Sequence, residues 1–434
     1  MKRTARDVRL GNRFEILRRL YRTQRVSRHE VAADTGLSFA TVSNTVGELL
    51  DLGLLAEAGF ADSGGGRPRA LVAVNAGRGT LVGVDVAETY IHVDVFDLAL
   101  RTLASVEHAL HPEENQPDDV VGHVAAAVEA ALRDAGGGDV LGIGVSLPGQ
   151  IERAGGVSVF APNWNWHDVP LGAALTARLE LPLYVDNPLK ASTVAELWFG
   201  AGREVDDLIV VTLGTGVGAG LAIGGSVYRG VTNSAGEWGH TTLVLDGRLC
   251  RCGNHGCVEA YVGGAGIMQT LRDLTPGSPL LHHDDQTATI EDLARAADRD
   301  DPVAAKTLAE TGRYLGAGIA DLVNIMNPEV VVLGGWVTDR LGGHLLPEVR
   351  AVVSRQALRR PGQAASLQLC GIPGNPVSLG AATLALEGFL TGVDAVDTRH
   401  AYGTTTPRHP HPWKEPPCPL PGSGTAAPPW PSRA

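Results

Sequence analysis

Apolar residues at helical spacing dominate the first fifty positions of the chain. In NRFEILRRLYR (12–22) they fall on one face of a predicted helix, with the arginines largely elsewhere. Ser27 precedes Glu30 by three positions, the spacing of a capping box, so a second helix is expected over 29–35. The apolar face of the first helix comprises Phe14, Leu17, Leu20 and Tyr21.

A turn and a third helix follow. Gly36 supplies the turn of a helix-turn-helix, and Ser38 can cap the helix predicted over 39–53. Its buried stripe is expected to comprise Val42, Val46, Leu49 and Leu50. The residues expected to face outward near its start are Ala40, Thr41, Ser43, Asn44 and Thr45. Small side chains and a hydrogen-bonding amide let a helix enter the major groove and meet base edges.

The segment 54–75 predicts two strands joined by a glycine-rich tip. Arg67 and Arg69 flank Pro68 there, and two guanidinium groups suit a narrow minor groove or a phosphate clamp. A small helical module that binds protein is the alternative, but the succession of helices, turn, polar-faced helix and basic tip favours a winged helix-turn-helix. The predicted DNA-binding residues are Ser38, Ala40, Thr41, Ser43, Asn44, Thr45, Arg67 and Arg69.

Beyond residue 80 the pattern changes to Val/Ile-rich runs alternating with Ala/Leu-rich stretches, which is typical of an α/β fold. Strand–turn–strand runs are predicted over 81–98 and 208–225, and single buried strands over 140–149 and 330–335. Because the two strand–turn–strand runs share one plan, we expect a duplicated, two-lobed architecture with a cleft between the lobes.

Composition defines the ends of these units. From about residue 400 the chain is rich in Pro, Gly and small polar residues, so this tail is expected to be disordered. The expected divisions are a winged helix-turn-helix over 1–75, a first lobe over 80–200, a second lobe over 201–390 and the tail over 395–434. No run of about 18 apolar residues occurs, so we expect no membrane span and a cytoplasmic location.

Charge is unevenly distributed along the 434 residues. The net charge is −12, but the first 80 residues hold 13 Lys/Arg against 8 Asp/Glu. A basic N-terminal unit joined to an acidic body indicates a polyanion contact at one end only.

Three of the five cysteines lie within eight positions of one another. Cys250, Cys252 and Cys257 follow His240 and together form a Cys₃His set, a common tetrahedral zinc site. His255 is the rival fourth ligand. With four protein ligands no position is left for water, so the predicted cofactor is structural Zn²⁺.

Several of these motifs resemble one known family. SRHEVAADTGLSFATVSNTVGELLDLGLL followed by GGGRPR is similar to the winged helix-turn-helix of the ROK regulators, a family named for repressors, open reading frames and kinases. The His followed by CxCGxxGCxE matches the family signature at every position. The resemblance covers about residues 10–390 and implies a winged helix-turn-helix followed by a two-lobed actin-like, sugar-kinase fold of the ribonuclease H-like ATPase type.

The resemblance also implies a sugar pocket. In ROK sugar kinases an Asn, an Asp, two Glu and a His hold the hexose hydroxyls, and four of these roles fall on Asn163, Glu237, His240 and Glu259. Carboxylates supply paired acceptors for vicinal hydroxyls, and His240 would bind zinc through one ring nitrogen and keep the other for the pocket.

The fifth role is lost. The kinase pattern N-D-A-N corresponds to VDNPLKASTVAELWFGAG, which puts Pro188 where the catalytic Asp should stand. Phosphoryl transfer to a hydroxyl needs a carboxylate to accept the proton, and proline has no side-chain acceptor. Asp186, two positions earlier on the strand, is the alternative acceptor.

The first phosphate loop has changed as well. The family pattern DxGGT is replaced by DVAET (85–89), so both glycines are gone and Glu88 would oppose a triphosphate. The second loop, LGTGVGAG (213–220), is intact. These two changes make kinase activity improbable.

The sequence therefore predicts a transcriptional regulator that is not an enzyme. Repression relieved by a ligand is the commoner mode in the family that the chain resembles, so a repressor is expected, with activation as the alternative. Its expected partners are double-stranded operator DNA and a sugar or sugar derivative, and it is expected to form a homodimer or homotetramer. The alternatives are a sugar kinase that uses ATP, and a DNA-binding regulator whose sugar cleft is vestigial.

Overall fold

The computed structural model describes residues 4–61, 68–111, 114–283 and 285–401. Two compact units divide the chain, Met1–Gly392 and Val393–Ala434. The described part of the second unit is the end of one helix, α13, which runs to Ala401. The first residues of the segment expected as a disordered tail are therefore helical, and 402–434 lie outside the described residues.

The N-terminal elements follow the order of a winged helix-turn-helix. They are α1 (Ala5–Thr23), β1 (Val26–Ser27), α2 (Arg28–Thr35), α3 (Phe39–Asp51), β2 (Leu55–Phe60) and β3 (Ala70–Val74). Ser27 accepts a hydrogen bond from the backbone N–H of Glu30, whose carboxylate accepts one from the Ser27 backbone N–H, so the predicted capping box is present. Gly36 ends α2 at a φ of 70°, as a left-handed turn requires.

One expectation about α3 is wrong. Thr45 is only 5% exposed and lies in the buried stripe with Val42, Val46 and Leu49, while Leu50 is partly buried. The stripe begins at Val42, so positions three and four residues later both turn inward. Thr45 is therefore not available to DNA.

Two five-stranded sheets share one topology, as the repeated sequence pattern predicts. In each, the first three strands form an antiparallel meander, and two further strands add in parallel beside the first. The first sheet contains β4 (Thr80–Val86), β5 (Tyr90–Asp97), β6 (Thr102–Ala109), β7 (Val140–Ser146) and β11 (Leu183–Asp186). The second contains β12 (Leu208–Leu213), β13 (Val217–Ile223), β14 (Ser226–Val227), β15 (Val330–Gly334) and β16 (Ser366–Leu369). This duplication confirms the two-lobed α/β fold.

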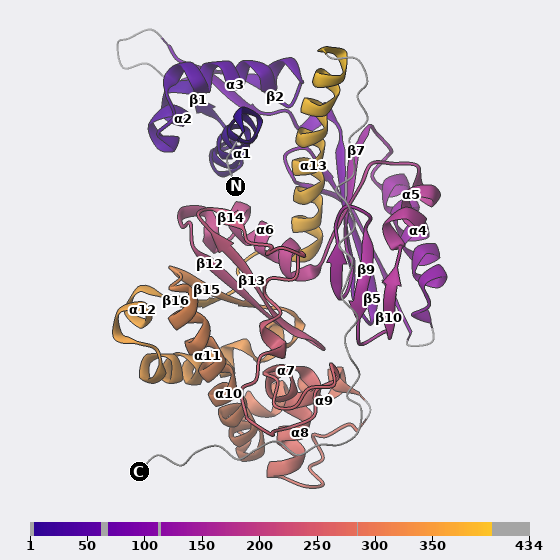
Figure 1. Cartoon of the computed structure of the whole chain (residues 1–434), viewed down its shortest axis with the longest axis vertical. Helices are drawn as coiled ribbons and strands as arrows, with labels where there is room; N and C mark the ends of the chain where they lie inside the picture. The colour runs from indigo at the N-terminus through magenta and orange to yellow at the C-terminus, as the bar shows by residue number, and fades with distance from the viewer. Residues whose placement is uncertain (1–3, 62–67, 112–113, 284, 402–434) are drawn as a thin grey trace, which may run out of the picture. The chain divides into compact units, whose positions relative to one another are not determined.

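Helices cover both faces of the first sheet (Figure 1). One face carries α4 (Pro117–Asp134) and α5 (Leu171–Leu179), and the other carries the part of α13 (Pro376–Ala401) that belongs to the first unit. The glycines of β4 and β7 allow α13 to lie close, because a Cβ on Gly83 or Gly144 would come within 2 Å of an α13 backbone oxygen.

Helix α6 (Pro188–Phe199) covers the second sheet and also meets α13. A Cβ on Gly380 of α13 would lie 1.9 Å from the Ala191 oxygen of α6, so these two helices pack closely between the two sheets. The outer face of the second sheet packs on a helical layer. Its helices are α7 (Glu259–Val262), α8 (Gly264–Leu274), α9 (Gln286–Ala297), α10 (Pro302–Met326), α11 (Trp336–Gln356) and α12 (Arg359–Ala364).

Smaller elements complete the described chain. A third sheet, inserted in the first lobe, contains β8 (Gln150–Glu152), β9 (Val157–Ala161) and β10 (Trp166–Val169). Single 3₁₀ turns occur at η1 (Ala76–Arg78), η3 (Ala201–Glu204) and η4 (Trp238–His240). No helix within the described ranges has the length and apolar character needed to cross a bilayer. The domain boundaries drawn from the sequence stay predictions.

Candidate functional site

The first phosphate-type loop lies in the turn between β4 and β5, and its carboxylates are already bonded. Asp85 is buried and accepts hydrogen bonds of 3.0 Å from Tyr90 Oη and Asn375 Nδ2. Glu88 accepts a short hydrogen bond from the amide of Asn163. Burial raises the pKa of Glu88, against the effects of the Asn163 hydrogen bond and of Arg251. This loop therefore presents carboxylates, and not a glycine-lined cradle, to the cleft.

The second glycine loop is intact in sequence but covered in the structure. A Cβ placed on Gly214 would lie 3.1 Å from Trp336 Nε1, so the indole of the first α11 residue packs directly on this loop. Gly218 and Gly220 face α6, where added Cβ atoms would meet Leu189 and Thr193. These glycines therefore permit close packing of α6 on the strand.

A large cavity adjoins both loops. Its volume is about 1590 Å³, and its lining includes Glu88, Asn163, Arg251, Trp336 and Asn375. Both carboxylates and guanidinium groups line it.

Pro188 occupies the first position of α6. Asn187 caps the helix by accepting a hydrogen bond of 3.1 Å from the Lys190 backbone N–H. A proline is favourable there because its missing N–H has no partner within the helix. The position aligned with the kinase Asp thus has no acidic group.

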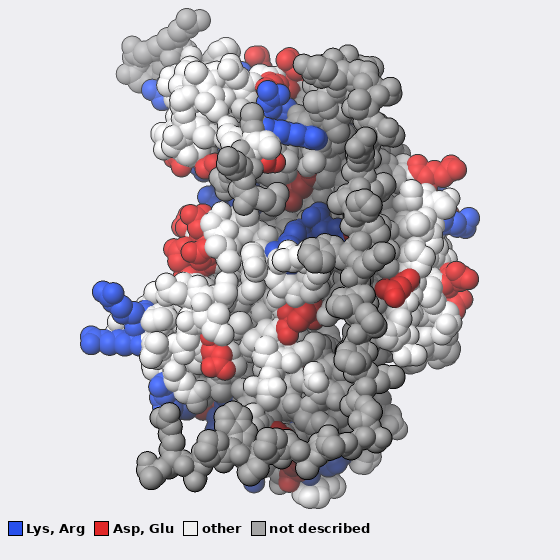
Figure 2. Space-filling view, viewed as in Figure 1, with Lys and Arg blue, Asp and Glu red and all other residues white. Residues whose placement is uncertain are grey.

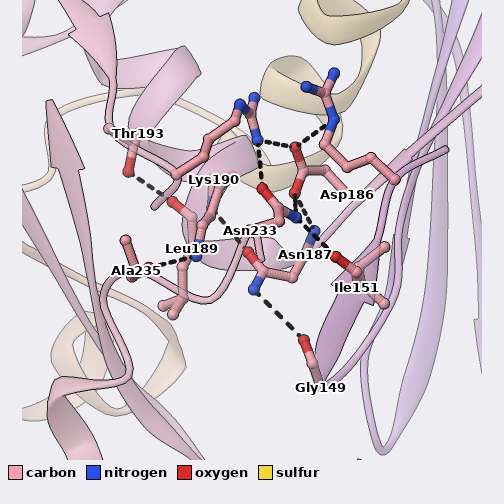
Figure 3. A network of polar contacts seen from close by, with 11 residues as sticks. Gly149, Ile151, Asp186, Asn187, Leu189, Lys190, Thr193, Asn233 and Ala235 are labelled. Atoms are coloured by element: carbon pink, nitrogen blue, oxygen red, sulfur yellow. Dashed lines mark hydrogen bonds and ion pairs between the residues drawn. The ribbon is translucent and has the colours of Figure 1, made fainter. Parts of the chain in front are cut away.

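Asp186, the alternative proton acceptor, is fully engaged. Its side chain is 1% exposed and forms an ion pair with Arg229, while Asn233 Nδ2 donates to it over 3.1 Å (Figure 3). Arg153 Nε lies 3.5 Å from the same carboxylate. A carboxylate held in this way has no free position for a substrate hydroxyl.

The other predicted sugar-binding groups lie in one neighbourhood. Burial raises the pKa of Glu237, opposed by the charges of Lys190 and His240, and Glu259 adds to the rise. One Glu259 oxygen accepts from the Val217 backbone N–H over 3.0 Å. The structure therefore brings Glu237, His240 and Glu259 together, whereas Asn163 turns to Glu88.

The Cys₃His set forms a compact cluster. Side-chain donor atoms of His240, Cys250, Cys252 and Cys257 all lie within 4.8 Å of one another. The Cys252–Cys257 sulfur separation and the distance from Cys250 Sγ to His240 Nδ1 are both 3.7 Å. Zinc–sulfur bonds of about 2.3 Å in a tetrahedron predict sulfur separations of about 3.7 Å, so the donors fit this ion.

A small hairpin holds these donors in place. Thr242 pairs with Cys257, and Leu249 pairs with His255, which brings the two ends of the motif together. His255 is exposed and is not among the clustered donors, so the geometry favours His240 as the fourth ligand. Burial raises the pKa of the Cys257 thiol, so metal binding has to displace its proton.

The predicted DNA-binding residues divide into three groups. Ser38 caps α3 by accepting from the Thr41 backbone N–H over 3.1 Å. Ala40 and Asn44 are exposed, and Thr41 and Ser43 are half-buried. Arg69 is exposed at the start of the β3 side of the hairpin. Arg67 lies outside the described residues.

Two arginines of α1 are engaged within the protein. Arg18 Nη1 donates to the Gly225 oxygen over 2.8 Å, and the Arg18 guanidinium lies 5.5 Å from the centre of the Trp198 ring. Arg19 forms an ion pair with Asp34 of α2 at 2.5 Å. Through Arg18, helix α1 thus contacts the body of the protein.

Sequence reasoning missed three features of the site. They are the Glu88–Asn163 contact, the Trp336 indole on the second loop, and Lys190, whose ammonium donates to the Ala235 oxygen over 2.6 Å. Glu88 was noted only for its charge. Trp336 directly follows the glycines of a buried strand, which was the one local signal available for it.

Known proteins resemble this chain over most of its length. A putative xylose repressor from Caldicellulosiruptor sp. is 31% identical over 89% of this chain and 98% of its own length. A glucokinase from Streptomyces coelicolor is 33% identical over 71% of this chain and 98% of its own.

A solved structure agrees with the first of these. A ROK family transcriptional regulator, described as a homologue of the E. coli MLC protein, superposes with a TM-score of 0.74 at 25% identity, over 90% of this chain and 99% of its own. The family model described as "ROK family" matches residues 81–387. The fold, the Cys₃His motif and these matches agree, and the chain belongs to the ROK family.

Proposed function

We propose that this protein is a DNA-binding transcriptional regulator, more specifically a repressor, and not an enzyme. The observation that carries the proposal is the combination of a helix-turn-helix with a cleft whose phosphate loops are filled by Glu88 and Trp336. The repressor relative covers 89% of the chain and the glucokinase 71%, a difference about as long as the N-terminal unit.

The effector is proposed to be a sugar. Carboxylates at Glu237 and Glu259 can accept hydrogen bonds from vicinal hydroxyls, and the imidazole of His240 can contribute a further bond. The named relatives make a pentose such as D-xylose the first compound to test. For this pocket to include Asn163, its amide has to leave Glu88 for the sugar.

Zinc is proposed as the resident metal, where it would crosslink the hairpin that holds His240 and the three cysteines. These residues then fix the imidazole, so that its second ring nitrogen faces the pocket. The proposed role of the site is structural.

DNA recognition is proposed to use the start of α3, with Ser38 as the helix cap and Ala40, Thr41, Ser43 and Asn44 at the groove. Arg69 would contact phosphate, and Arg67 is proposed for the same role from the sequence alone. In a homodimer or homotetramer, half-sites would lie about one helical turn apart, ~34–36 Å or a multiple of it. Movement of the lobes on sugar binding would change the distance between the helix-turn-helix units of two protomers.

Selection of bound genomic fragments tests this function directly. We expect wild type to enrich a defined set of fragments and D-xylose or a related sugar to release them. Asn44→Ala should relax sequence preference at one position by about 1–3 kcal/mol, whereas Arg69→Ala should weaken binding evenly across sequences. Failure to enrich any fragment at low salt would exclude DNA binding.

A sugar kinase is the second candidate, because the chain is similar to glucokinases. Incubation with ATP and a panel of hexoses separates the two functions. We expect no sugar-dependent release of ADP from the wild-type protein. Sugar-dependent ADP release that disappears in a Trp336→Arg variant would instead favour the kinase. A DNA-binding regulator with a vestigial cleft is the third candidate. It would be favoured if none of the monosaccharides in a thermal-shift panel raised the melting temperature of the protein.

A further inference from the structure

One segment of the second lobe contacts three parts of the molecule in succession. It runs from Gly224, at the β13–β14 turn, to His240 at the proposed effector site. We propose that this segment, 224–240, couples the effector site to the N-terminal unit, with Arg229 and Asn233 as the positioning residues that hold it on Asp186. This inference rests on the proposed function, because it describes how the same site would be regulated.

The first contact is with the N-terminal unit. The Gly225 oxygen accepts the hydrogen bond of 2.8 Å from Arg18 of α1. Arg18 is held on its other side by the Trp198 ring of α6. On the face drawn in Figure 2, basic side chains gather below the N-terminal helices with acidic ones nearby. A cavity of about 910 Å³ beside this contact is lined by residues of α1 and of the turn. A shift of the turn would therefore act on α1 through the hydrogen bond between Arg18 and Gly225.

The second contact lies four residues further on. Arg229 pairs with Asp186 and also donates to Asn233 Oδ1 over 3.1 Å (Figure 3). The Asn233 amide donates to Asp186 Oδ1 over 3.1 Å and to the Ile151 oxygen over 3.0 Å. These bonds fasten the segment to the end of β11 and to β8, which belong to the first lobe.

The third contact lies next to the effector site. Lys190 is fully buried, and its ammonium donates to the Ala235 oxygen two residues before Glu237. Gly236 has a φ of 96°, and a Cβ there would come within 1.9 Å of the Ala219 oxygen. The backbone that carries Glu237 is thus pressed on β13 and leaves little room for independent movement.

These contacts make the segment a connection with few alternative arrangements. A buried carboxylate that loses its hydrogen-bond and ion-pair partners destabilises the fold. Asp186 therefore favours states in which it keeps Arg229 and Asn233 or finds other partners in their place. Glu387 of α13 adds to this balance, because its charge is felt by Arg18, Arg229 and Arg153 together. A displacement at Glu237 would therefore reach Arg229 and then Gly225 along continuous backbone.

Hydrogen exchange followed by mass spectrometry tests the coupling on the full chain, without an effector or an operator. In Arg229→Ala, amides of 224–227 and of the second half of α1 should exchange at least about fivefold faster than in wild type. Arg229→Lys should restore part of the protection. The matched control is Arg313→Ala, which removes an exposed pair with Glu310 on α10 and should leave α1 unchanged.

The reciprocal variant completes the experiment. Because coupling free energy is the same in both directions, Arg18→Ala should speed exchange in 229–240. Faster exchange confined to the neighbourhood of each substitution would overturn the proposal. If Arg229→Ala does not fold, Asn233→Ala and Arg18→Ala provide the same comparison. A positive exchange result in a protein that binds no DNA would retain the coupling and reject the regulator function, so the two failures are distinguishable.

Discussion

Glu88 and Asn163 show how single side chains can change the use of a cleft. They are 75 positions apart in sequence and belong to a turn of the first sheet and to the inserted β8–β10 sheet. Their contact places a carboxylate where the family pattern has glycine and gives the amide a partner before any sugar arrives. Asn163 is therefore already hydrogen-bonded, and the proposed sugar would have to compete with Glu88 for its amide.

The raised pKa of Glu88 makes a prediction about stability and pH. Because burial favours the protonated form in the folded state, ionisation of Glu88 disfavours folding as pH rises through the raised pKa. Glu88→Gln removes this charge and can still accept from Asn163. We expect the variant to melt at a higher temperature than wild type, with a larger difference at pH 8 than at pH 5.

Glu129→Gln is the control for that measurement, because Glu129 is exposed on α4. It should change the melting temperature little at either pH. An equal effect of Glu88→Gln at both pH values would contradict the argument from burial.

At the scale of elements, local signals determine the N-terminal unit well. The capping box at Ser27, the turn at Gly36 and the cap at Ser38 each depend on residues within four positions, and all three are present. The buried face of α3 was misjudged at Thr45, which is buried, and at Leu50, which is only partly buried, because one residue of rotation decides between burial and exposure.

The site was less predictable than its motifs. The proposed metal ligands could be found because they lie within eighteen positions of one another, and their side chains cluster in the structure. Trp336 on Gly214 and Lys190 on Ala235 could not, because those contacts join segments more than forty residues apart whose distance depends on the packing of whole helices on the second sheet.

The hairpin that carries the proposed zinc ligands gives the prediction at the scale of elements. Cys252→Ser should abolish stoichiometric zinc and lower the melting temperature by more than about 5 °C, because the crosslink that closes the hairpin is lost. Zinc content by plasma spectrometry and thermal denaturation measure the two effects. Cys370→Ser removes a cysteine outside the cluster and should retain both the metal and the stability. Equal zinc in the two variants would exclude the proposed ligand set.

At the scale of the whole first unit, α6 and α13 hold the two sheets together through glycine contacts. Gly144 of β7 lies so close to α13 that a Cβ would be 1.8 Å from the Ala381 oxygen. Neither backbone can move without separating the sheet from its helix. This contact therefore contributes to the stability of both lobes.

Two glycine substitutions test this packing. Gly144→Ala should destabilise the protein by more than about 2 kcal/mol, because it inserts a methyl group into closed space. Gly122→Ala is the matched control, since this exposed glycine of α4 has no atom within 4 Å of the added Cβ, and it should stabilise by about 0.5–1 kcal/mol. Denaturant midpoints measure the stability of both variants. A mild effect of Gly144→Ala would show that α13 does not pack closely on β7.

The position of α13 also has a consequence for synthesis of the protein. Strands β4 and β7 leave the ribosome early, but the helix that covers their glycine-bearing face begins only at Pro376. Throughout most of translation that face of the sheet therefore lacks its native cover. Helix α3, which ends at Asp51, is likewise made long before the two lobes are complete.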